Sequence, residues 1–99
     1  MKKVGKPKVK TLGMGQDYVA KQMEGKADEY LPKHLADVES VMFIHEGECY
    51  LIINEEDVLL RPGDAYIIPP KIKHQFKGIT DFKGIHFMPK DIKIEYFDD

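Results

Sequence analysis

Four histidines, His34, His45, His74 and His86, are the side chains of this chain with the widest chemical range. A neutral imidazole donates one hydrogen bond, accepts another, and is the commonest protein ligand of transition metals. His34 stands at the entrance to a predicted strand, His74 begins one, His45 ends an apolar one, and His86 lies inside one. Because forty residues separate His34 from His74, only the fold can bring them together.

The elements that position these histidines are predicted to be strands, because the apolar residues recur with a period of two. Strong patterns occupy residues 41–45, 49–53, 58–60, 65–68, 74–77, 82–88 and 92–97, and weaker ones 9–12 and 17–23. Residues 54–57 are a polar hairpin connection. Arg61-Pro62-Gly63-Asp64 is a tight turn, and Pro69-Pro70 ends the strand before it.

No stretch of ten residues has a convincing helical pattern, so eight to ten short strands predict an all-β sandwich or barrel. Ninety-nine residues leave room for one domain, spanning residues 1–99. The strand-like segments 8–12 and 92–97 are candidate sheet edges.

Composition excludes several classes of protein. Fifteen basic and seventeen acidic residues give a net charge of −2, which offers no electrostatic footprint for nucleic acid. No apolar run approaches the length of a membrane-spanning helix, and no apolar stretch of a signal peptide follows the basic start. The single cysteine, Cys49, is expected to be buried and reduced. These features predict a soluble, cytoplasmic chain that binds neither nucleic acid nor membrane.

The residues from Gly63 to His74 closely resemble the second motif of the cupins, which reads Gly, five residues, Pro, one residue, Gly, two residues, His. Gly63, Pro69 and His74 match, and Lys71 replaces the inner glycine. A recognisable but altered first motif runs from residue 25 to 47. The resemblance, to small single-domain cupins, covers residues 25–89. It implies a double-stranded β-helix, or jelly-roll barrel.

In metal-binding cupins the first motif supplies two histidines in a His-x-His pair and a glutamate, and the second motif supplies a third histidine. The resemblance places Pro32 at the first histidine, His34 at the second and His74 at the third. Proline has no donor atom for a metal.

The carboxylate position has two candidates. Counting forward from His34 selects Glu39, whereas counting back from Gly47 selects Ser40. A shift of one residue moves a side chain to the opposite face of a strand. We favour Ser40, because the strand that leads to Gly47 is uninterrupted; a bulge near Val38 would instead bring Glu39 inward.

Two main functions follow from the resemblance. The first is binding of a small molecule, or of a weakly held metal, at a degenerate site formed by His34, His74 and His86 with Met42 and Phe76. The alternative is a metal-dependent enzyme of the cupin dioxygenase or isomerase type, in which those histidines and Glu39 hold Fe, Mn, Ni or Zn.

A lesser alternative is a metal-free enzyme of the epimerase type, with His34 or His74 as base and Tyr50 or Tyr66 as acid. Catalytic residues stay unassigned at this stage. Small cupins are commonly dimers, so the resemblance also implies a homodimer.

Overall fold

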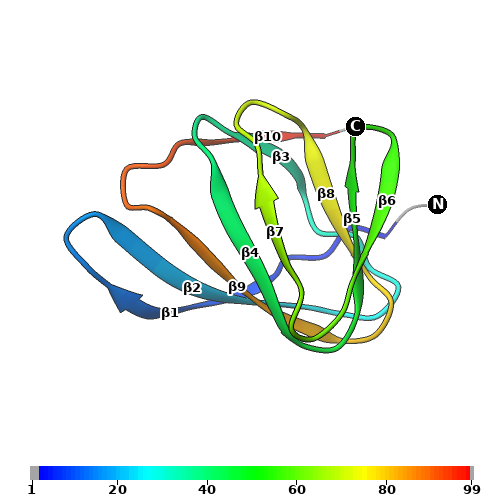
Figure 1. Ribbon diagram of the computed structural model, residues 1–99. Helices are drawn as coiled ribbons and strands as arrows, with labels where there is room; N and C mark the ends of the chain where they lie inside the picture. Colours follow the sequence, from blue (N-terminus) through cyan, green and yellow to red (C-terminus); the bar gives the residue numbers. More distant parts are fainter. Residues whose placement is uncertain (1–2, 99) are drawn as a thin grey trace.

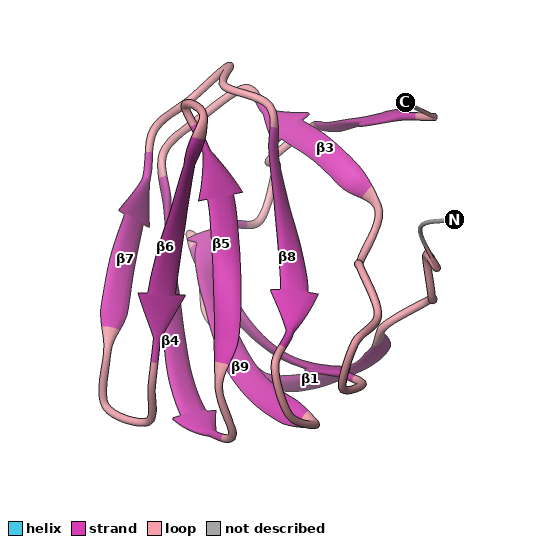
Figure 2. Ribbon diagram, turned by 90° about the vertical axis from the view of Figure 1, so that its right-hand side faces the viewer, coloured by secondary structure: helices cyan, strands magenta, loops and turns pink. Residues whose placement is uncertain are grey.

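The computed structural model describes residues 3–98, which form ten strands in two antiparallel sheets that pack face to face (Figures 1 and 2). The strands are β1 Lys8–Met14, β2 Tyr18–Gly25, β3 Lys33–Ala36, β4 Ser40–Glu46, β5 Cys49–Ile53, β6 Glu56–Leu60, β7 Ala65–Ile68, β8 His74–Gly78, β9 Phe82–Pro89 and β10 Ile94–Phe97. One sheet has the order β1-β2-β9-β4-β7 and the other β10-β3-β8-β5-β6. The all-β prediction is confirmed.

Strand alternation builds a dry core between the two sheets. In β5, Cys49, Leu51 and Ile53 are buried, and in β4, Met42 and Ile44 face them from the other sheet. Alternate residues point to the same face of a strand, so β5 contributes three apolar side chains to this core and β4 two. The cysteine prediction is confirmed, because Cys49 is fully buried and burial raises the pKa of its thiol to about 12.

Two connections depend on left-handed backbone. The β5–β6 hairpin turns at Asn54 and Glu55, both with positive φ, as a two-residue hairpin requires. The predicted four-residue connection was therefore too long, and Glu56 already belongs to β6. Lys71, which replaces the motif glycine, has a φ of 64°. Lys71 thus adopts the left-handed backbone conformation that the glycine of the motif would adopt without strain.

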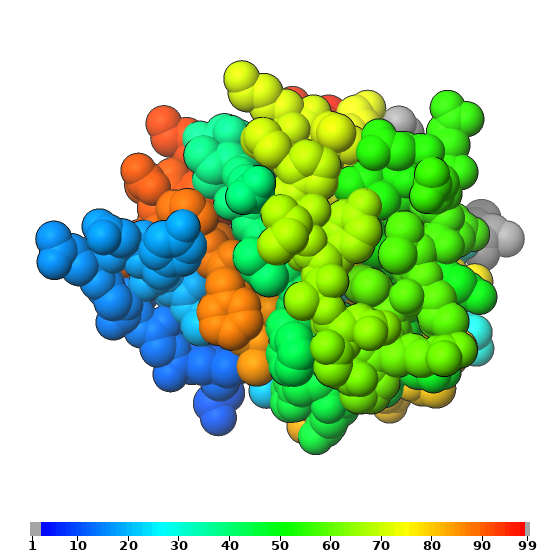
Figure 3. Space-filling view, in the orientation of Figure 1, coloured from blue at the N-terminus to red at the C-terminus, as the bar shows by residue number. Residues whose placement is uncertain are grey.

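The N-terminal hairpin is longer than its weak pattern predicted. All seven residues of β1 are exposed, and the register of β1 against β2 shifts between Thr11 and Gly13. In the space-filling view this hairpin projects from the body of the molecule (blue, Figure 3). β1 and β10 are edge strands of the two sheets, which confirms the edges predicted from segments 8–12 and 92–97.

The edge formed by β3 and β10 is attached to its sheet by few bonds. β10 pairs with β3 over four residues, whereas β3 pairs with β8 only through His34 and His74. The Lys71 N–H adds a hydrogen bond of 2.7 Å to the Ala36 carbonyl. Figure 2 shows β3 splayed away from β8 beyond this point. In the described part of the chain, no helix is long and apolar enough to cross a membrane.

Candidate functional site

His34 and His74 are brought together by the single pairing between β3 and β8. Their ring centroids lie 4.4 Å apart with an interplanar angle of 62°, so the rings meet edge to face. The topology thus closes the forty-residue gap that separates them in the sequence.

The hydrogen bonds of these two rings fix their tautomers. Nδ1 of His34 lies 3.0 Å from the Pro32 carbonyl oxygen, and Nδ1 of His74 lies 3.0 Å from the Ile72 carbonyl oxygen. A carbonyl can only accept, so each Nδ1 carries the proton and donates it. Each Nε2 therefore carries a lone pair, and neither has a hydrogen-bond partner among residues 3–98.

His86 and Ser40 form the second part of the site. His86 Nε2 is hydrogen-bonded to Ser40 Oγ at 2.8 Å, and both side chains are buried. This contact places Ser40 inward, as the count from Gly47 favoured. Glu39 is exposed and lies one residue before β4, so no bulge turns it toward the histidines. The carboxylate that the first motif normally supplies has no counterpart here.

Burial keeps these imidazoles uncharged. Desolvation lowers the pKa of His74 to about 4, with a smaller effect from the charge of His34. Desolvation also lowers the pKa of His86 to about 4, helped by the charges of His34, His74 and Lys21. The pKa of His34 is lowered by burial as well. At neutral pH the site therefore presents neutral rings.

A cavity of about 350 Å³ lies between the β1-β2-β9 half of one sheet and the β3-β10 edge of the other. His34 and His86 are on its wall, and Tyr96 lies with its ring centroid 5.6 Å from that of His34. Most of the remaining wall is apolar: Pro7, Val9, Val19, Met23, Leu31, Pro32, Met88, Ile92 and Ile94. Lys21 and Lys90 complete it. A largely apolar pocket of this size with few polar groups is typical of a small-molecule site.

Not every residue predicted for ligand binding reaches this cavity. Met42 and Phe76 do not line it; they belong to the dry core, which extends away from the cavity. Their pattern predicted burial correctly, but it carried no signal that separates the core from the pocket. The His74 ring contacts the His34 ring but does not line the cavity.

Neither predicted tyrosine acid lines the cavity. Tyr66 packs against the dry core, and Tyr50 alternates with the buried Cys49 and Leu51 and so faces away from it. The tyrosine on the cavity wall is Tyr96, which sequence reasoning missed. Lys21 was also missed, although its alternation with Val19 and Met23 in β2 was the available signal.

The donor atoms fit a cupin metal centre poorly. Nε2 is free in His34, which lines the cavity, and in His74, which does not. His86 Nε2 is bonded to Ser40, and none of the described wall residues is a carboxylate. Within residues 3–98 no three His, Cys, Asp or Glu side chains form a group able to hold an ion. The positive charge of Lys21, which also acts on His86, further disfavours a cation there.

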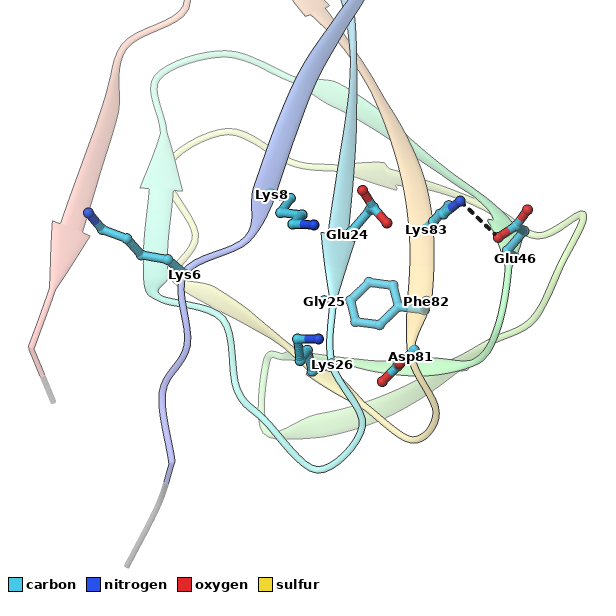
Figure 4. A pocket seen from close by; sticks show the side chains of 9 residues that line it. All are labelled: Lys6, Lys8, Glu24, Gly25, Lys26, Glu46, Asp81, Phe82 and Lys83. Carbon is cyan, nitrogen blue, oxygen red and sulfur yellow. Dashed lines mark ion pairs between the residues drawn. The ribbon is translucent and has the colours of Figure 1, made fainter.

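A second hollow of about 140 Å³ lies at the other end of β2 and β9, where Phe82 sits against Gly25 (Figure 4). Four lysines and three carboxylates surround it, and Lys83 and Glu46 form an ion pair of 3.3 Å. Since its charges are mixed and it contains no histidine, we place the candidate site in the larger cavity.

Comparison with known proteins identifies the fold and the family. A family model described as Cupin domain matches residues 22–86. The chain is 32% identical over 62 residues to an uncharacterized HTH-type transcriptional regulator, YbfI, of Bacillus subtilis (strain 168). That match covers 59% of the chain and 22% of the regulator, so the chain spans about a fifth of that relative.

Solved structures show the same fold at low sequence identity. A cupin-2 domain containing protein from Shewanella frigidimarina superposes with a TM-score of 0.76 at 20% identity, over 84% of this chain and 80% of that one. A mutant salicylate 1,2-dioxygenase from Pseudoaminobacter salicylatoxidans in complex with gentisate has a TM-score of 0.83 at 12% identity, over 94% of this chain and 30% of that one. These likenesses confirm a cupin-like, all-β fold.

Proposed function

Since this chain belongs to the cupin domain family, we propose that it binds a small, mostly apolar molecule in the cavity beside His34 and His86, without a resident metal. The observation that carries the proposal is the wall of this cavity: nine apolar residues surround two neutral imidazoles. Such a site gains affinity from apolar burial and orients its ligand by a few hydrogen bonds.

His34 is the residue proposed to orient the ligand. Its Nδ1–H is committed to the Pro32 carbonyl, so its Nε2 is available to accept a hydrogen bond from a ligand hydroxyl or N–H. The Tyr96 ring, which lies beside that of His34, supplies an aromatic surface next to this acceptor. His86, tied to Ser40, is a fixed part of the wall.

Phenol is a suitable probe, because it combines an apolar ring with one hydroxyl donor. In an NMR titration, phenol is expected to shift the backbone amides of β2, β3 and β9. Affinity should fall about tenfold in His34→Ala, the equivalent of one lost hydrogen bond. His45→Ala is the matched control, because His45 is hydrogen-bonded to Gln22 and does not line the cavity. Unchanged amides on these strands, or equal affinity in His34→Ala, would contradict the proposal.

A second candidate is the metal-dependent enzyme. It is favoured by the two adjacent rings of His34 and His74, whose Nε2 atoms are both free, and by the likeness to a dioxygenase. Metal analysis of the purified protein separates the candidates. We expect less than one ion per chain. A stoichiometric ion that is lost in the His34→Ala/His74→Ala variant would support the enzyme and overturn ligand binding without a metal.

The homodimer stays a prediction. The two edge strands, β1 and β10, are the elements that a second copy would cover. Light scattering at micromolar concentration tests it, and a strict monomer would contradict it.

A further inference from the structure

Lys21 occupies an unusual place for a lysine, on the inner face of a sheet. In β2 the inward residues Val19, Lys21 and Met23 all line the cavity. Lys21 lies directly opposite His86 of β9 in the antiparallel register. Directly opposed residues share a face, so the Lys21 side chain is on the same side of the sheet as the buried His86.

No carboxylate of the cavity balances this charge. Lys21 and Lys90 are both on the wall, and none of the described residues that line the cavity is an Asp or Glu. The ion pairs found in the described part of the chain involve other cations, those of Lys3, Arg61 and Lys83. Lys21 is half-buried, so an anion that enters the cavity could pair with its ammonium without competing with a carboxylate of the described wall.

The neighbouring imidazoles do not supply the missing negative charge. His34, His74 and His86 are neutral near pH 7, since burial lowers the pKa of each ring. The positive charge of Lys21 contributes to the lowered pKa of His86, so this charge acts on the site itself. The polar part of the cavity is therefore a cation beside neutral hydrogen-bonding rings.

We propose that the ligand of this cavity is a small apolar molecule with a single carboxylate, which pairs with the Lys21 ammonium beside His86. This inference rests on the proposed function and names the chemical class of its ligand. A carboxylate fits better than a phosphate, because the wall offers two lysines, no arginine and no helix N-terminus. The apolar wall accommodates the rest of the molecule.

The test compares an anion with its neutral isostere: benzoate with benzamide, and hexanoate with hexanamide. In calorimetric titrations each carboxylate is expected to bind at least about tenfold more tightly than its amide. Lys21→Met keeps an apolar stem but removes the charge, and it should abolish this preference while the amides still bind. Lys10→Met is the matched control, because Lys10 is exposed on β1 and alternates with the cavity residue Val9. It should leave the preference unchanged.

The outcomes separate this inference from the proposed function. Equal binding of carboxylates and amides by the wild type would overturn the proposal that the ligand carries a carboxylate. The proposal that the cavity binds a small molecule would be unaffected. A preference that survives Lys21→Met would overturn the role of Lys21. If no probe binds, phenol included, the binding function itself fails and the inference with it. Should Lys21→Met not fold, the wild-type preference must still weaken with added salt, and a salt-independent preference would contradict the ion pair.

Discussion

The region between β4, β5, β6 and β8 is packed solid, whereas the region between β2, β9, β3 and β10 encloses a cavity. Both regions are built from strands with one inward face. In the packed region those faces carry large apolar residues, such as Leu51 and Phe76 of one sheet and Met42 of the other, which belong to one buried cluster. In the hollow region they carry His34, His86 and Lys21. Leu31, which belongs to both the core and the cavity wall, marks the boundary.

The difference teaches that one region of a small sandwich can supply most of its stability and leave the other free for binding. The packed region excludes water and holds adjacent strands by continuous ladders, as between β5 and β8. One wall of the hollow region is the β3–β10 edge, whose ladder to β8 consists of the single pair His34–His74. Stability and binding are therefore expected to respond to different mutations.

The largest expected effect comes from removing side chain volume in the packed region. Leu51→Ala deletes a fully buried side chain and should lower the free energy of unfolding by about 2–5 kcal/mol. Ile94→Ala, a matched aliphatic truncation in the cavity wall, should cost about 1 kcal/mol or less. Urea denaturation measures both. Equal losses of unfolding free energy in the two variants would contradict the claim that the packed region supplies most of the stability.

The next effect is acid destabilisation that originates in the hollow region. The pKa values of His74 and His86 lie near 4 in the folded protein and near 6.5 when unfolded. Between these values the unfolded chain binds more protons, so acid favours unfolding. As the pH falls from 6.5 to 5, each histidine should remove up to about 1.4 kcal/mol of stability per pH unit.

Denaturation midpoints measured across this pH range check the effect. His86→Asn should give a shallower dependence on pH, because one of the two strongly shifted rings is gone. A wild-type protein whose stability is flat from pH 6.5 to 5 would show that these rings are not buried as described.

The smallest expected effect concerns the β7–β8 loop, which contacts β3 of the hollow region through the Lys71–Ala36 hydrogen bond. Lys71 has a positive φ, which costs a residue with a Cβ about 1–2 kcal/mol, whereas glycine adopts it freely. After the entropy that glycine adds to the unfolded chain, Lys71→Gly should stabilise the protein by about 0.5–1 kcal/mol in thermal or urea unfolding. Lys71→Ala, which keeps a Cβ, should bring no such gain. A gain in both variants would trace the effect to the lysine side chain rather than to the backbone.

Much of the fold could be predicted from local pattern. The bounds of β5 and β7 agree with the predicted strands 49–53 and 65–68, because period-two apolarity and turn residues define them. The second motif also located His74 correctly at the start of β8. The β1–β2 hairpin was weaker in the sequence, because all seven residues of β1 are exposed and burial therefore imposes little apolar alternation on the strand.

The site could be predicted only in part, because its members meet across strands. The pairing of His34 with His74 follows from topology, and neither Met42 nor Phe76 carries a local sign that it belongs to the core rather than the cavity. Lys21 shows the same limit. A lysine in a strand is usually solvated, so its alternation with Val19 and Met23 is a weak signal, and its register opposite His86 shows that it faces inward.

The single residue pair between β3 and β8 has a consequence for how a ligand enters. Local opening requires the loss of only the bonds that hold a segment. Here those are one ladder pair, the Lys71–Ala36 hydrogen bond and, just before β3, the hydrogen bonds of Leu31 with Phe76 and Gln75 of β8. The β3–β10 edge should therefore swing outward far more often than β5 or β8 separate from each other. Its amides would exchange with solvent without global unfolding, and each opening would uncover the cavity. The sparsely bonded contact between β3 and β8 is thus the expected entry route for a ligand.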